Sequence, residues 1–123
     1  MILLVAAGGA AGSVLRYVTG FVLSNFFGTA WPYGTIAVNL SGSFLIGLAA
    51  SCLAMRCPDP RLAALLIAGF LGGFTTFSSF MNETMQFLLT GEWRAAACCL
   101  LLQMGGGLAA AALGIGAFRL LSR

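Results

Sequence analysis

The sequence predicts an all-α membrane protein with four transmembrane helices. Of its 123 residues, 60% are hydrophobic and 7% are charged, and the mean hydropathy is +1.01. A soluble domain of this size could not bury so much apolar surface. Short turn-like segments divide the chain into apolar runs that are each long enough to cross a bilayer. We therefore expect a single transmembrane domain over residues 1–123, with spans at about 2–27, 34–55, 62–90 and 95–118.

The charges are few, and all of the basic ones are arginines. The net charge of +3 is too small to indicate a nucleic-acid partner, so the arginines are better interpreted as topology signals and site residues. Four spans place both termini and the loop at residues 56–61 on one side of the membrane. That side carries Arg56, Arg61, Arg119 and Arg123, and the other carries only Arg94. The positive-inside rule then favours cytoplasmic termini, but so modest a bias leaves both orientations open.

The first span combines small residues with an arginine. Gly8 and Gly12 form a GxxxG pair, which permits another helix to approach closely. Arg16 lies within the span, where a charge is costly unless it snorkels, faces water or has a polar partner. Three roles therefore remain open for Arg16: simple snorkelling, an anion-attracting vestibule, or a structural partner for a polar group.

The second span carries a polar stripe. Thr35, Asn39 and Ser43 recur every four residues and so share one face of a helix. In a membrane such a stripe is either a polar contact between helices or the wall of a water path. Asn39 lies near mid-span, and its amide offers two N–H donors that suit an anion.

The third span has an unusual middle. Residues 72–79 include two glycines, two threonines and two serines, where a plain transmembrane helix would carry leucine. This composition predicts a helix that is interrupted near the membrane centre. Irregular backbone at that depth is tolerated only where it is buried in protein or lines a wet cavity. Because broken membrane helices usually present backbone groups to an ion, we expect the break to be the functional core.

The fourth span is almost wholly alanine, leucine and glycine, and Gln103 is its only strong polar group. Its glycines predict close packing against another helix; they are Gly105, Gly106, Gly107, Gly114 and Gly116. Cys98 and Cys99 precede them without a CxxC spacing, and we interpret both as small apolar residues at a helix or lipid interface.

Two ionic roles follow from the break. The carbonyl groups between Gly72 and Thr75 suit a hard monovalent cation, and a two-fold dimer would double their number. Phe77 and Phe80 lie on one helical face, and their electropositive ring edges suit an anion. The remaining anion contacts would come from the Asn39 amide and from nearby hydroxyl groups; these are Thr76, Ser78 and Ser79. Simple packing of the two phenylalanines is the alternative.

Other functional classes receive less support. The chain has no histidine, acidic pair, nucleophile elbow or phosphate loop, so we predict that it is not an enzyme. A proton-coupled four-span exporter of small solutes needs an intramembrane carboxylate, and only Glu83 is available for that role. A membrane assembly subunit without transport activity is the third possibility.

Several segments stand out in order along the chain: Gly8-Gly9-Ala10-Ala11-Gly12 with Arg16-Tyr17, Pro32-Tyr33-Gly34-Thr35, Val38-Asn39, Gly42-Ser43-Phe44, and Gly72-Gly73-Phe74-Thr75-Thr76-Phe77-Ser78-Ser79-Phe80 with Glu83. This set resembles the Fluc (CrcB) family of fluoride channels over essentially the whole chain. The resemblance implies an antiparallel, dual-topology homodimer in the bacterial inner membrane. It further implies two pores that passively export cytoplasmic fluoride and so lower its toxicity.

The resemblance also implies roles for particular residues. A central sodium ion, which is not transported, would be bound by the backbone carbonyls of Gly72 and Thr75. Phe77, Phe80 and Asn39 fall on the family's pore-lining positions, and Arg16 falls on its first-span arginine. The family usually carries hydroxyl groups along the fourth span, whereas this chain offers Gln103, which we assign to the fluoride pathway. The arginine bias implies that an oppositely oriented paralogue is an alternative partner to a second copy.

Overall fold

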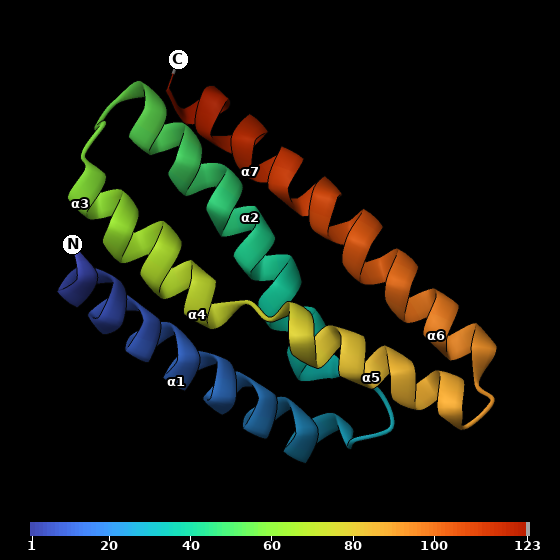
Figure 1. Cartoon of the computed structure of the whole chain (residues 1–123). Coiled ribbons are helices and arrows are strands. Elements are labelled where there is room, and N and C mark those ends of the chain that lie inside the picture. The colour runs from blue at the N-terminus through green and yellow to red at the C-terminus, as the bar shows by residue number, and fades with distance from the viewer. Residues whose placement is uncertain (123) are drawn as a thin grey trace.

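The computed structural model describes residues 1–122, which form four long apolar helices connected by short turns (Figure 1). The helices span Ile2–Phe27, Tyr33–Met55, Pro60–Leu89 and Trp93–Leu121, and each is long and apolar enough to cross a membrane. The predicted all-α class is confirmed, and the bounds differ from the expected ones by a few residues. Residue 123, one of the arginines counted for topology, lies outside the described residues.

The first two spans are continuous helices, whereas the other two are composite. Helix α1 covers Ile2–Phe27 and α2 covers Tyr33–Met55. The third span consists of α3 (Pro60–Leu62), the π-helical segment η1 (Ala63–Leu71), α4 (Gly72–Phe74) and α5 (Phe77–Leu89). The fourth consists of α6 (Trp93–Leu100), the π-helical segment η2 (Leu101–Gly105) and α7 (Gly106–Leu121).

The turns follow from local chemistry. Gly28 and Gly91 have φ angles of 81° and 79°, which residues with a side chain rarely adopt, and both lie just after a helix. At the opposite end of the molecule, the Asp59 carboxylate accepts a hydrogen bond from the Arg61 amide at 2.8 Å and caps α3. Figure 1 shows that the N-terminus, this loop and the end of α7 lie at the same end.

Glycines let the first and third spans approach closely. Helix α1 lies beside η1 and α4 (Figure 1), and both Gly8 and Gly12 are buried there. A Cβ atom at Gly12 would collide with the carbonyl oxygen of Phe70 and the amide nitrogen of Phe74. The GxxxG face of α1 therefore packs directly against the backbone that precedes the break.

A second close contact joins the second and fourth spans, where α2 lies along α7 (Figure 1). A Cβ atom at Gly114 would collide with the Phe44 carbonyl, and one at Gly47 would collide with the Ala111 carbonyl. Gly105 and Gly116 make no such contact within the single chain, where both have open space around them.

Gly114→Ala is therefore expected to weaken the α2–α7 contact. Its methyl group would meet backbone atoms that cannot move independently, and overpacking of this kind costs about 1–3 kcal/mol. Gly116→Ala is the matched control on the same helix, because its methyl group enters open space. Thermal unfolding in detergent should show a lower midpoint for Gly114→Ala alone. Equal midpoints for the two variants would contradict this packing.

Candidate ion site at the broken helix

The third span is broken at two threonines. Helix α4 ends at Phe74, and Thr75 and Thr76 have extended backbone with ψ angles of 159° and 116° before α5 begins. Gly72 remains helical, with φ −63° and ψ −35°. The predicted interruption is thus present, but it lies at the β-branched residues, which favour extended backbone, and not at the glycines. Gly73 instead permits close approach to α1, because a Cβ atom there would lie 2.5 Å from the Gly9 carbonyl oxygen.

Thr76 restarts the helix. Its Oγ1 accepts a hydrogen bond from the Ser79 amide at 3.2 Å, which makes it the N-cap of α5. The same hydroxyl donates to Ser79 Oγ at 3.0 Å and lies 3.4 Å from Ser78 Oγ. The hydroxyl groups predicted beside the break therefore form one cluster at the start of α5.

Asn39 clamps the break from α2. Its Oδ1 accepts from the Thr76 amide at 2.8 Å, and its Nδ2 donates to the Thr76 carbonyl at 2.9 Å. The side-chain amide thus pairs with the backbone as a neighbouring strand would. Nδ2 also donates to Gln103 Oε1 at 2.7 Å. Since an amide nitrogen has two protons, the protein itself engages both donors that were expected to be free for an anion.

The Asn39 clamp and the Thr76 cap each free one backbone carbonyl. In a continuous helix, the carbonyl oxygens of Gly72 and Thr75 would accept from the amides of Thr76 and Ser79. Those amides donate instead to Asn39 Oδ1 and Thr76 Oγ1. The oxygens of Gly72 and Thr75 therefore lose their helical partners, and carbonyl oxygens of this kind fit a hard cation such as sodium.

Arg16 contacts the break from the opposite side. Its Nε donates to the Gly73 carbonyl at 3.0 Å, and the side chain is half-buried. Of the three roles left open by the sequence, this contact corresponds to a structural partner for a polar group. The arginine replaces a hydrogen bond that the interrupted helix cannot supply to that carbonyl.

The two phenylalanines lie beside the break with their rings edge to face. The centroids of Phe77 and Phe80 are 5.9 Å apart, at an interplanar angle of 83°. Phe80 is 3% exposed and Phe77 is 70% exposed. Both border a groove of about 450 Å³, which Asn39 and Ser43 of α2 and residues of the fourth span also line.

This groove gathers most of the predicted site residues. Its lining includes Asn39, Ser43, Gly72, Thr75, Thr76, Phe77, Phe80 and Gln103. Ser78 and Arg16 are not part of the lining: Ser78 lies beside Thr76, and Arg16 approaches the break from α1. Gln103, which lies far from the break in sequence, meets it through Asn39.

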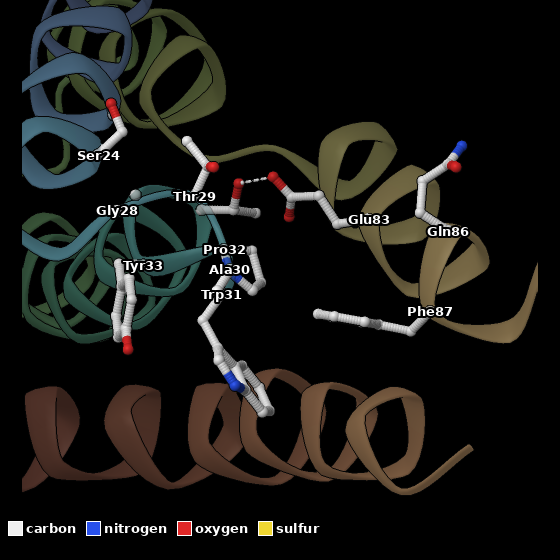
Figure 2. A pocket seen from close by; sticks show the side chains of 13 residues that line it. Ser24, Gly28, Thr29, Ala30, Trp31, Pro32, Tyr33, Glu83, Gln86 and Phe87 are labelled. Carbon is white, nitrogen blue, oxygen red and sulfur yellow. Dashed lines mark hydrogen bonds between the residues drawn. The ribbon is translucent and has the colours of Figure 1, made fainter. Parts of the chain in front are cut away.

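Glu83 belongs to a second pocket, of about 370 Å³, beside the turn between α1 and α2 (Figure 2). The Thr35 hydroxyl donates to Glu83 Oε1 at 2.6 Å. In the described residues, the other carboxylate oxygen, Oε2, is buried without a hydrogen-bond partner. Figure 2 shows Glu83 and Phe87 projecting from α5 towards the side of the pocket that holds Thr29 to Trp31, and the rings of Phe87 and Trp31 are 5.5 Å apart. The polar stripe of α2 is thus divided, since Thr35 contacts Glu83 whereas Asn39 and Ser43 reach the groove.

Comparison with known proteins identifies the family. The family described as CrcB-like protein, Camphor Resistance (CrcB), matches residues 3–115. The chain belongs to the CrcB family. A relative from Rhodospirillum centenum (strain ATCC 51521 / SW) is 49% identical over 98 residues, which is 79% of this chain and 78% of the relative. Another, from Shewanella sp. (strain ANA-3), is 44% identical over 96 residues, which is 78% of this chain and 77% of the relative.

Both CrcB relatives are named fluoride-specific ion channel FluC. These relatives are channels and not enzymes, so the prediction that this chain is not an enzyme is confirmed. The resemblance to the Fluc (CrcB) family is confirmed as well. With four membrane-spanning helices, the chain is a multi-pass membrane protein of this channel family.

The sequence analysis gave no site role to two residues of this CrcB chain, Cys99 and Thr84. Cys99 is fully buried, and its Sγ lies 3.4 Å from Gln103 Nε2 and 3.5 Å from Thr84 Oγ1. Cys99 was expected to act only as a small apolar residue at an interface. The four-residue spacing of Cys99 and Gln103 was a usable signal, because it places both side chains on one helical face.

Proposed function

We propose that this chain is a passive, fluoride-selective channel that exports cytoplasmic fluoride and lowers its toxicity. The observation that carries the proposal is the clamped break, which places a phenylalanine pair at a polar groove within the third span. The fluoride-specific names of the relatives support the choice of anion. Hydrogen fluoride would enter as a neutral molecule and ionise in the cytoplasm, and the anion would leave through the channel.

The pathway follows from what the groove offers. Aromatic ring edges are electropositive, and Phe80 lies against Phe77 in a T-shaped pair, so this pair presents edges as well as faces. The Ser43 hydroxyl lines the groove and makes no hydrogen bond within the described part of the chain. Weak donors of this type can replace water around a small anion without binding it too tightly to leave. Thr76 would add a hydroxyl contact from the groove lining, and Ser78, beside Thr76, would meet the anion only outside this groove. Asn39 would hold the wall.

Sodium and a second copy belong to the same proposal. The carbonyls of Gly72 and Thr75 would bind a structural, non-transported sodium ion, which would supply a fixed positive charge at the centre of the assembly. One chain offers too few oxygens to enclose an ion, whereas two breaks brought together by a two-fold axis offer about twice as many. We therefore propose an antiparallel homodimer in the bacterial inner membrane. An oppositely oriented paralogue is the alternative partner.

Fluoride release from liposomes tests the function. Vesicles loaded with potassium fluoride and carrying the purified protein should release fluoride once valinomycin permits potassium to leave, because passive anion flow is electrogenic. A fluoride-selective electrode measures the release, and chloride-loaded vesicles measure selectivity. Release that requires a proton gradient would favour the exporter centred on Glu83. Absence of release under all conditions would favour an assembly subunit.

Replacement of sodium tests the carbonyl site. Sodium is replaced by N-methylglucamine during purification and assay, so that potassium is the only inorganic cation left. We then expect slower fluoride release or dissociation of the dimer on size exclusion. A bulky organic cation cannot enter a ring of backbone carbonyls. Unchanged flux and unchanged dimer after exhaustive sodium removal would contradict the proposed sodium site and leave the fluoride pathway standing.

A further inference from the structure

Gln103 is unusual because it is a buried polar side chain in a span that is otherwise apolar. It is 6% exposed, and in the part of the chain that the structure describes only Thr84 joins it among buried polar residues. Gln103 lies in the π-helical segment η2, and π-helical turns occur frequently at functional sites. Burial in a membrane span requires that its amide be satisfied by protein groups.

Both ends of the Gln103 amide are engaged. Its Oε1 accepts from Asn39 Nδ2 at 2.7 Å, and its Nε2 donates to Cys99 Sγ at 3.4 Å. If the Gln103 amide were reversed, its NH₂ group would face the NH₂ group of Asn39. Because Thr76 holds Asn39 with its nitrogen towards Gln103, the contact is made only when Gln103 presents its oxygen.

The direction of the Asn39 amide matters for the break. Thr76 needs an acceptor for its N–H and a donor for its carbonyl, and Asn39 supplies both in one orientation only. Reversed, Asn39 would place its NH₂ group against the Thr76 N–H. Gln103 stabilises the orientation that clamps Thr76, because its oxygen takes the second proton of Asn39 Nδ2.

A chain of polar contacts holds Gln103 from its other side. Cys99 Sγ lies 3.5 Å from Thr84 Oγ1, and Thr84 Oγ1 donates to the Phe80 carbonyl at 2.8 Å. The contacts therefore connect Phe80 and Thr84 on α5 to Cys99 on α6 and to Gln103 on η2. From Gln103 they continue to Asn39 on α2, which contacts the break. The aromatic pair and the clamp are connected through Gln103.

We propose that Gln103 is a positioning residue for the ion pathway, which fixes the Asn39 amide in the orientation that clamps Thr76 and does not itself bind the ion. This inference rests on the proposed channel function. It replaces the hydroxyl-like pore contact that the sequence suggested for Gln103 with an indirect role. The burial of the side chain leaves it little surface to offer an ion.

Two substitutions distinguish these roles. Q103M keeps the length of the side chain but cannot accept from Asn39, and we expect about a tenfold loss of fluoride flux per dimer. Q103E still presents an oxygen to Asn39, so it should recover most of the flux that Q103M loses. If Gln103 instead donated to the anion, Q103E would be the worse variant, because it introduces an acidic group without N–H donors. That reversed order, or wild-type flux in Q103M, would overturn the proposal.

Hydrogen–deuterium exchange gives a readout that does not depend on transport. The peptide containing Thr76 should exchange faster in Q103M and at nearly the wild-type rate in Q103E, since the Thr76 amide donates to Asn39. Should Q103M fail to fold, Cys99→Ala, which removes the second Gln103 contact together with the contact to Thr84, should still accelerate exchange there. Unaltered exchange in every folded variant would contradict the inference, whereas an inactive wild-type protein would contradict the channel function alone.

Discussion

Asn39→Asp is expected to abolish fluoride flux while leaving the four-helix fold in place. A carboxylate can still accept from the Thr76 amide, but it cannot donate to the Thr76 carbonyl or to Gln103 Oε1. Each buried acceptor left without a donor costs about 1–3 kcal/mol, so the local geometry of the break should change.

The flux assay in liposomes measures this effect, and we expect release at the rate of protein-free vesicles. Ser41→Ala is the matched control on the same helix, because its exposed hydroxyl donates only to its own helix, at the carbonyls of Ala37 and Val38. Size exclusion and circular dichroism should be unchanged for both variants. Substantial flux through a folded Asn39→Asp protein would show that the clamp is not needed for conduction.

Phe80→Ile should also reduce fluoride flux to the background rate. Phe80 is buried and meets the Phe77 ring edge to face, and isoleucine retains apolar bulk but has no ring edge to present to an anion. A change of shape in a packed core costs about 1–3 kcal/mol, which a four-span bundle should tolerate. The expected outcome is therefore a folded protein that does not conduct.

Phe21→Ile on α1 is the control for Phe80→Ile, because Phe21 is 58% exposed and lies outside both pockets near the break. Flux for the control should match the wild-type protein, and thermal unfolding should show that both variants fold. Wild-type flux in Phe80→Ile would indicate that the phenylalanines only pack, which was the alternative left open by their spacing.

The spans and the existence of the break could be predicted because each depends on local composition. Long apolar runs define the membrane helices, and the β-branched Thr75 and Thr76 interrupt one of them. The composition of residues 72–79 did not show which of its glycines, threonines and serines would carry the break. Both glycines permit extended backbone, but Gly72 is helical and Gly73 serves the close contact with Gly9 on α1.

The partners of the polar side chains could not be predicted, because they depend on how distant segments meet. Asn39 and Gln103 are separated by 64 positions, and nothing in the sequence around either residue indicates that the two form a hydrogen bond. For the same reason, the role of Arg16 stayed open until the Gly73 carbonyl was placed beside it. Sequence patterns identify the polar side chains that need hydrogen-bond partners, but the partners themselves are determined by tertiary packing.

The interrupted segment is braced from two directions, by Arg16 on one neighbouring helix and by Asn39 on another. A stretch of backbone fastened on both flanks has little freedom to swing open or shut by itself. We therefore expect the backbone of this segment to keep one conformation and not to act as a gate. Any movement that controls ion passage would then lie outside this segment.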